Sequence, residues 1–182
     1  MMAEMPVLSW PFSRAATAEI DWDDVYCTEL PRVLNYFRYR VGQAETAEDL
    51  TSTTFEKAWR ARAKYRPERA SIATWLLTIA RHVAIDYYRA RRVDVALDDV
   101  AEPARQAALD DDIQRGLDRR RLASLIAALP ERERELLALK YGAEETNRAI
   151  ARLTGLSESN VGTILSRTVA TLRSRWEAGG QS

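Results

Sequence analysis

An apolar stripe over residues 71–92 constrains the fold more than any other feature of this chain. Its members recur every three or four positions, which places them on one helix face: Ile72, Trp75, Leu76, Ile79, Ala80 and Val83. Only 7 Gly and 6 Pro interrupt the 182 residues. An all-β chain, with a turn about every ten residues, needs more. The pattern therefore predicts an all-α protein.

The opposite stripe of the same helix is unusual for a solvent face. It mixes basic, aromatic and apolar side chains: Thr74, Leu77, Arg81, Ile85, Tyr88 and Arg92. Two earlier helices are expected over residues 22–41 and 44–63, each with its own apolar face. Three helices therefore fill the first half of the chain.

The second half has the pattern of a helix-turn-helix. Helices are predicted over residues 131–141, 146–153 and 157–176. Gly155 lies in the turn between the last two helices, and Ser157 is suited to cap the final helix. The arrangement favours DNA binding, although other helical hairpins share a glycine turn.

The final helix begins with small polar residues that suit base edges in a major groove, and it continues with arginines that suit phosphates. The candidates are Ser157, Ser159, Asn160, Thr163, Ser166 and Arg167, followed by Arg173 and Arg175. Gly162 lowers helix propensity. Close approach of the backbone to DNA explains this glycine, and so does simple neutrality.

The zero net charge of the chain, from 27 Lys and Arg against 27 Asp and Glu, hides alternating blocks. The net charge is −6 over residues 19–56, +8 over 57–92, −6 over 93–118 and +4 over 119–182. Such blocks permit a nucleic-acid partner despite the neutral total.

The basic block also contains aromatic residues. Tyr65 and Tyr88 are the candidates for stacking on unpaired bases, whereas Trp59 and Trp75 are expected to pack in the core.

The composition argues against several classes of protein. A single cysteine, Cys27, and a single histidine, His82, exclude a disulfide framework and a Cys or His metal cluster. Cys27 is expected to be buried. His82 and Asp86 lack a nucleophile or a second acidic pair, so we expect no enzyme and no cofactor. Without an apolar run of about 20 residues or a signal peptide, we predict a cytoplasmic protein without membrane insertion.

Two stretches resemble conserved regions of bacterial sigma-70 family factors of the extracytoplasmic-function group. The residues that resemble region 2 are Ala47-Glu48-Asp49-Leu50, Phe55, Ala58, Trp59, Trp75-Leu76, Ile79-Ala80-Arg81, Asp86 and Arg89. Those that resemble region 4 are Leu129-Pro130-Glu131-Arg132, Ile150-Ala151, Gly155-Leu156-Ser157, Val161, Leu165, Arg167 and Leu172. Together they span about residues 22–176.

The resemblance implies two small helical domains, a region 2 bundle and a region 4 helix-turn-helix, joined by a flexible acidic linker. We expect region 2 over residues 19–92, the linker over 93–118 and region 4 over 119–178. Residues 1–18 and 179–182 are expected to be tails.

It also implies a subunit that binds core RNA polymerase and directs it to promoters, where it recognises the minus-thirty-five and minus-ten elements and melts the latter. Region 2 is expected to bind the β′ clamp helices through Asp49, Leu50, Ser52, Thr53, Phe55 and Trp59. Region 4 is expected to bind the β flap and, through the polar start of its last helix, the minus-thirty-five element. Because this group is often restrained by an anti-sigma factor, such a protein joins promoter DNA among the expected partners.

The minus-ten element is assigned to the basic block. Lys64, Tyr65, Arg66 and Arg69 are expected to hold an unstacked base, and Arg81, Tyr88, Arg91 and Arg92 to bind the upstream fork.

Some positions depart from the family pattern. Gln and Glu are common where this chain has Ser52 and Thr53, Asn where it has His82, Glu where it has Ala149, and Lys-Ser-Arg where it has Gly162-Thr163-Ile164.

The main alternative is a two-domain helix-turn-helix regulator that binds duplex DNA without polymerase. More distant alternatives are an enzyme acting on nucleic acid and a module that holds another regulator. Co-purification with core polymerase distinguishes the sigma factor from the regulator.

Overall fold

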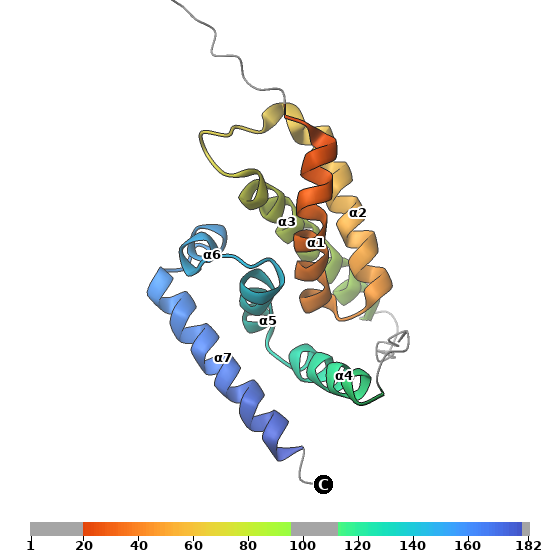
Figure 1. Cartoon of the computed structure of the whole chain (residues 1–182), viewed down its shortest axis with the longest axis vertical. Helices are drawn as coiled ribbons and strands as arrows, with labels where there is room; N and C mark the ends of the chain where they lie inside the picture. The colour runs from red at the N-terminus through yellow and green to blue at the C-terminus, as the bar shows by residue number, and fades with distance from the viewer. Residues whose placement is uncertain (1–19, 96–112, 180–182) are drawn as a thin grey trace, which may run out of the picture.

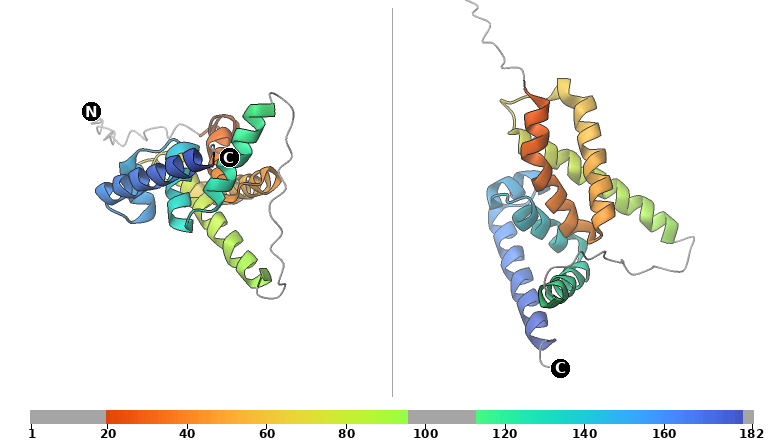
Figure 2. Two further views of the ribbon diagram at one scale, coloured as in Figure 1. Left: turned by 90° about the horizontal axis from the view of Figure 1, so that it is seen from below. Right: turned by 45° about the vertical axis from the view of Figure 1, so that its right-hand side comes forward.

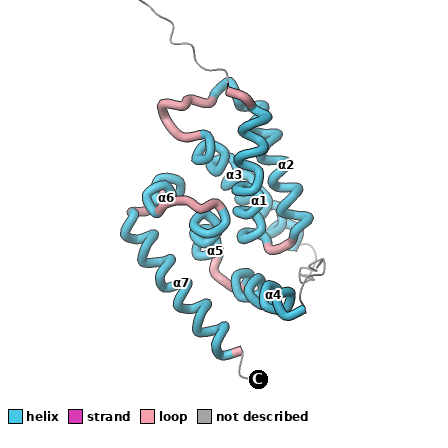
Figure 3. Tube along the Cα trace, in the orientation of Figure 1, coloured by secondary structure: helices cyan, strands magenta, loops and turns pink. Residues whose placement is uncertain are grey.

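The computed structural model describes residues 20–95 and 113–179, referred to below as the first half and the second half, and both are built from helices (Figure 3). The first half contains α1 (Trp22–Val41), α2 (Ala44–Ala61), the 3-10 turn η1 (Arg62–Lys64) and α3 (Ile72–Val95). The second half contains α4 (Ile113–Ala127), α5 (Glu131–Leu137), the π-helical turn η2 (Ala138–Gly142), α6 (Asn147–Thr154) and α7 (Glu158–Ala178). With no strand in either described range, the all-α prediction is confirmed.

Capping residues explain where several helices begin and end. The Asp21 carboxylate accepts hydrogen bonds from the backbone N–H groups of Asp23 and Asp24, at 3.0 and 3.3 Å, and so starts α1. The left-handed Gly42, with φ 76°, ends this helix. The helix predicted over residues 22–41 therefore agrees with α1, whereas the predicted 44–63 helix tightens into η1 after Ala61.

In the first half, α1 and α2 pack side by side and α3 packs against both (Figure 1). The predicted apolar stripe of α3 faces this bundle, with Leu76, Ala80 and Val83 buried. The opposite stripe is also covered in part, since Leu77 is fully buried. Two members of that stripe, Arg81 and Tyr88, contact residues of the second half.

In the second half, α5 and η2 lie between α1 and α7 (Figure 1). The helix α4 packs against the C-terminal end of α7 (Figure 2), where the Arg121 guanidinium lies 4.4 Å from the Trp176 ring centroid. The α6 and α7 helices meet at the Gly155 turn.

The two halves share one hydrophobic core. Tyr36 and Phe37 of the first half and Leu136 and Leu139 of the second are all 0% exposed and belong to one cluster. Most of the predicted linker lies outside the described residues, as does the 1–18 tail, but residues 113–118 are helical and open α4. Among the helices of the two described ranges, none has the length and hydropathy that crossing a bilayer requires.

Candidate nucleic-acid interface

The α6 and α7 helices form the predicted helix-turn-helix. Gly155 between them has a left-handed φ of 74°, and its N–H donates to the Ala151 carbonyl at 2.9 Å. The Ser157 hydroxyl accepts from the Asn160 N–H at 3.2 Å and starts α7. The predicted helix, glycine turn and serine-capped helix are therefore confirmed.

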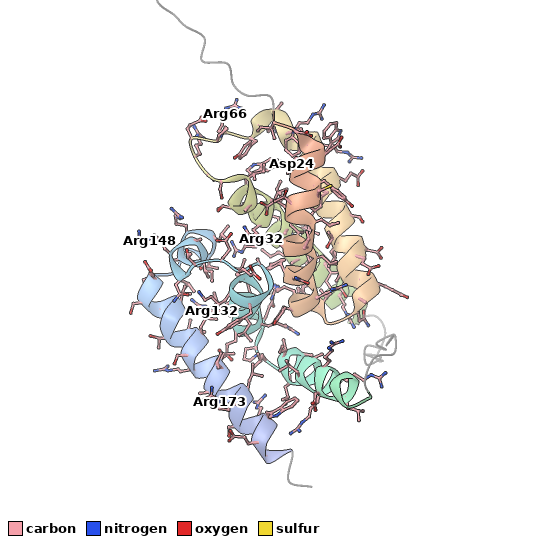
Figure 4. The ribbon with its side chains drawn as sticks, in the orientation of Figure 1. Asp24, Arg32, Arg66, Arg132, Arg148 and Arg173 are labelled. Carbon is pink, nitrogen blue, oxygen red and sulfur yellow. The ribbon has the colours of Figure 1, made fainter. Side chains whose placement is uncertain are left out.

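The polar face of α7 is open to solvent. The predicted minus-thirty-five residues are all exposed: Ser157, Ser159, Asn160, Thr163, Ser166 and Arg167. On the other side of the helix, Val161 and Leu165 are buried against the second half. Arg173 lies further along α7 in Figure 4, and Arg148 projects from the neighbouring α6. This face presents hydroxyls, an amide and guanidinium groups, the groups that read base edges and bind phosphates.

Gly162 lies within this helix, and the structure leaves room there for a side chain. A Cβ atom on Gly162 would lie 3.5 Å from Nδ2 of Asn147, an ordinary van der Waals distance. The packing of α6 on α7 therefore gives no reason for a glycine at this position.

A basic loop joins η1 to α3 at the far end of the first half. Three predicted minus-ten residues are exposed here: Lys64 at the end of η1, and Arg66 and Arg69 on the loop. Arg66 holds the loop by donating from Nη1 to the carbonyls of Ala63 and Tyr65, at 2.8 and 2.9 Å. In Figure 4, Arg66 lies at the tip of this loop, away from Arg173. The two predicted DNA surfaces thus occupy separate parts of the molecule.

Tyr65, the predicted stacking residue of this loop, already has partners within the chain. Its ring centroid lies 5.2 Å from that of Trp75, and its hydroxyl donates to the Ala70 carbonyl at 3.0 Å. Burial raises the pKa of Tyr65, and the nearby Glu68 carboxylate raises it further. Stacking of Tyr65 on a DNA base stays a prediction.

The other predicted minus-ten residues lie along α3 and separate into two kinds. Arg81 and Tyr88 point into the junction between the halves, where Arg81 Nε lies 2.8 Å from Glu135 Oε1 and the Tyr88 hydroxyl donates to the Arg40 carbonyl. Arg91 is exposed and donates to the Tyr87 hydroxyl at 2.8 Å. The Arg92 side chain lies outside the described residues.

The predicted polymerase-binding residues of α2 divide by burial. Asp49, Ser52 and Trp59 are exposed, Thr53 and Phe55 are half-buried, and Leu50 is buried at 9% exposure. The exposed members recur at helical spacing and line one stripe of α2. Leu50 therefore supports this face from below and does not form part of its surface.

The exposed stripe of α2 continues into an aromatic patch of Trp22, Tyr26, Phe55 and Trp59. The Trp22 and Trp59 ring centroids lie 6.0 Å apart, and those of Tyr26 and Phe55 lie 4.8 Å apart. The prediction that Trp59 packs in the core is wrong, because its side chain is 50% exposed at the edge of the bundle. Sequence reasoning missed Trp22 and Tyr26, although their spacing of four residues places them on one helix face.

Two further predictions about single residues need revision. The prediction that Cys27 is buried is wrong, since it lies on the outer face of α1 between buried Val25 and Glu29. Arg40, only 1% exposed, was missed altogether. Its burial could have been predicted from its position, because Arg40 follows Val33, Tyr36 and Phe37 on one face of the helix. The aliphatic part of a long arginine side chain can extend such an apolar face.

Comparison with known proteins agrees with the two-part organisation. The family model for Sigma-70 region 2 matches residues 25–93, and that for Sigma-70 region 4 matches residues 119–172. The chain is 33% identical to RNA polymerase sigma factor YlaC of Bacillus subtilis over 150 residues, which cover 80% of this chain and 86% of that protein. It is 28% identical to ECF RNA polymerase sigma factor BldN of Streptomyces coelicolor over 163 residues, which cover 87% of this chain and 62% of the relative.

The fold is also similar to that of a solved structure. The sigma factor RpoE of Bartonella quintana, in complex with the anti-sigma factor NepR, matches with a TM-score of 0.74 at 20% identity, over 86% of this chain and 97% of that one. At this identity the likeness concerns the fold.

Proposed function

Since the chain belongs to the sigma-70 family of RNA polymerase sigma factors, in the extracytoplasmic-function group, we propose that it uses three separate surfaces to start transcription. The exposed stripe of α2 binds the β′ clamp helices of core polymerase. The basic loop and α3 bind and melt the minus-ten element, and the polar face of α7 reads the minus-thirty-five element. The proposal assigns no catalytic step to this chain and places it with polymerase in the cytoplasm.

The observation that supports this proposal best is the separation of two exposed polar and basic surfaces. Lys64 at the end of η1 forms one together with Arg66 and Arg69 of the following loop, and the start of α7 forms the other. A promoter presents two elements some distance apart, so a protein that reads both needs two such surfaces. The exposed stripe of α2 is a third surface, and it binds polymerase.

Melting needs binding energy and no nucleotide hydrolysis. Unpairing costs a few kcal/mol per flipped base, and stacking on an aromatic or apolar surface returns about 1–3 kcal/mol per base. Guanidinium groups on the loop contribute further binding free energy through contacts with phosphates.

The comparisons do not support a duplex-binding regulator that works without polymerase, because the relatives are named as RNA polymerase sigma factors. The anti-sigma factor expected from the sequence stays among the partners of this chain, and the Bartonella sigma factor of similar fold is seen in complex with one.

Reconstituted transcription tests the proposal. Core polymerase with the chain should produce run-off transcripts from a promoter library. Arg66→Ala with Arg69→Ala should reduce open-complex formation at least tenfold while leaving polymerase binding intact. The control is Arg119→Ala with Arg120→Ala, which removes the same charge from exposed positions on α4. Equal promoter melting by the loop variant and this control would contradict the assignment of the loop.

A further inference from the structure

The two halves of the chain meet in a close contact between backbones. A Cβ atom on Gly142 of η2 would lie 2.8 Å from the Asn35 carbonyl oxygen and 3.0 Å from Cα of Tyr36, both in α1. Real Cβ atoms essentially never approach another atom as closely as 2.8 Å, and here that atom belongs to a helix backbone. Only glycine therefore lets η2 seat on α1 as the structure shows, and the contact between the halves is specific.

Two arginines of the first half bind two glutamates on one face of α5. Arg40 donates from Nη1 to the Glu131 carbonyl at 3.0 Å, and its Nη2 lies 3.7 Å from Glu131 Oε1. Arg81 donates from Nε to Glu135 Oε1 at 2.8 Å and from Nη1 to the Leu153 carbonyl. Glu131 and Glu135 are one helical turn apart, so α5 presents both carboxylates to α1 and α3 together.

Tyr88 completes this contact. The guanidinium of Arg40 lies 5.0 Å from its ring centroid, that of Arg134 lies 5.6 Å away, and its hydroxyl donates to the Arg40 carbonyl. Burial raises the pKa of Tyr88, which keeps the hydroxyl protonated as a donor. The residue therefore lies between an arginine from each half.

Closing the contact between the halves has a cost in free energy, because it buries polar atoms without partners. Within the described residues, Nε of Arg40 and Nε of Arg134 are buried without a hydrogen-bond partner. A buried donor without an acceptor loses the hydrogen bonds that water gives it in the open chain. This cost opposes closure and suits a contact that opens.

Arg81 and Tyr88 are also the residues expected to bind the upstream fork of the minus-ten element. Guanidinium groups bind carboxylate and phosphate with the same geometry. A guanidinium held by Glu135 is not available to a phosphate, and a ring between Arg40 and Arg134 is not available to a base.

We propose that α5 takes the place of promoter DNA in the free chain: Glu131 on Arg40 and Glu135 on Arg81 form a latch that holds the halves closed and occupies the fork-binding surface. The inference rests on the proposed function, because the competing ligand is promoter DNA. Opening the latch removes Glu131 from Arg40, Glu135 from Arg81 and Arg134 from Tyr88, so Arg40 joins the fork-binding residues.

Distances between the halves test the latch in the full-length chain. Cys27 is the single cysteine and is exposed, so spin labels on it and on Ser174→Cys of α7 report the separation of the halves by double electron–electron resonance. Glu131→Gln with Glu135→Gln should convert a short distance into a longer, broader distribution. Glu133→Gln with Glu177→Gln removes the same charge outside the latch and should keep the short distance. Gly142→Val should lengthen it by a steric route that leaves the carboxylates in place.

Binding of a fork oligonucleotide of mixed sequence tests the competition. Each phosphate contact adds about 0.9 to the slope of log K against log salt. Freeing two guanidinium groups should therefore steepen the slope by about two in the latch variant and leave it unchanged in the control.

Unchanged distances in the latch variant would overturn the latch, and longer distances with an unchanged salt slope would overturn the competition with DNA. Run-off transcription by the unmodified chain is measured beside these arms. Its failure would remove the proposed function, while the distances would still report on the latch.

Discussion

At the scale of single residues, burial depends on what lies across the junction as much as on residue type. Arg40 is among the largest fully buried side chains of the described residues, yet Trp59 is half exposed. Arg40 is buried because α5 supplies a carbonyl and a carboxylate, which a charged group needs when it leaves water. Trp59 is exposed because α2 ends at the rim of the bundle.

Arg40→Ala should destabilise the chain by about 2 kcal/mol. The substitution leaves the ring of the half-buried Tyr88 and the Glu131 carbonyl without their partner. Breaking a fully buried pair costs about 3–5 kcal/mol, but the Glu131 carboxylate is 40% exposed and water can solvate it. Urea unfolding measures the change. Arg38→Ala, an exposed arginine on the same helix, should stay within about 0.5 kcal/mol of the original chain. Equal losses in both variants would contradict this account of Arg40.

Glu145→Gln should flatten the dependence of stability on pH. Burial raises the pKa of Glu145 above its ordinary value of 4.5, and Glu29 raises it further, while Arg32 and Arg152 oppose the shift. Because the folded pKa exceeds the unfolded one, the free energy of unfolding falls as pH rises from about 4.5 through the folded pKa. The Gln variant lacks this fall, which urea midpoints at pH 4 and pH 8 measure. The neighbouring Glu144→Gln variant should keep the pH dependence of stability that the unmodified chain shows. Identical pH profiles for the unmodified chain and both variants would refute the prediction.

At the scale of helices, the sequence predicted most where local chemistry sets the boundaries. The α1 boundaries follow from the Asp21 cap and Gly42, and α7 begins after the Ser157 cap. The π-helical turn η2 was not predicted. Its geometry depends on the seat of Gly142 against α1, a contact between residues more than 100 positions apart.

Two glycines of the helix-turn-helix should respond to the same substitution with opposite sign. Gly155→Ala should cost about 1 kcal/mol, because φ is 74° there and a Cβ disfavours the left-handed region. Gly162→Ala should instead stabilise the chain by about 0.5–1 kcal/mol, since alanine is the better helix former and the nearest atom to the new Cβ lies 3.5 Å away. Thermal unfolding of both variants checks the signs.

The Gly162→Ala variant also separates the two explanations of this glycine. If the backbone approaches DNA closely at this position, the stabilised variant should lose transcription from promoters that depend on the minus-thirty-five element. If the glycine is neutral, activity should be retained. A destabilised Gly162→Ala chain would contradict the helix-propensity argument itself.

At the scale of the molecule, the distribution of charge explains how a chain of zero net charge can bind DNA. Arg81 of the +8 block pairs with Glu135 of α5 inside the closed chain, so part of the positive charge is compensated before DNA arrives. The sequence contained a sign of this junction in the mixed stripe of Leu77, Arg81 and Tyr88 on α3. Which partner covers that stripe could not be predicted, because the pairing of α3 with α5 depends on packing across the linker.

The shared core predicts that damage in one half is felt in the other. Leu76→Ala removes a fully buried side chain of α3, which should cost about 2–5 kcal/mol. Because Tyr36 and Phe37 of the damaged bundle belong to the same buried cluster as Leu136 and Leu139, α5 and η2 should lose protection together with α1–α3. Hydrogen exchange resolved by peptide mass spectrometry measures this. Leu122→Ala, at a position 42% exposed on α4, should leave exchange in the first half unchanged. If Leu76→Ala accelerates exchange in α1–α3 alone, the halves are independent units and the shared core contributes no coupling between them.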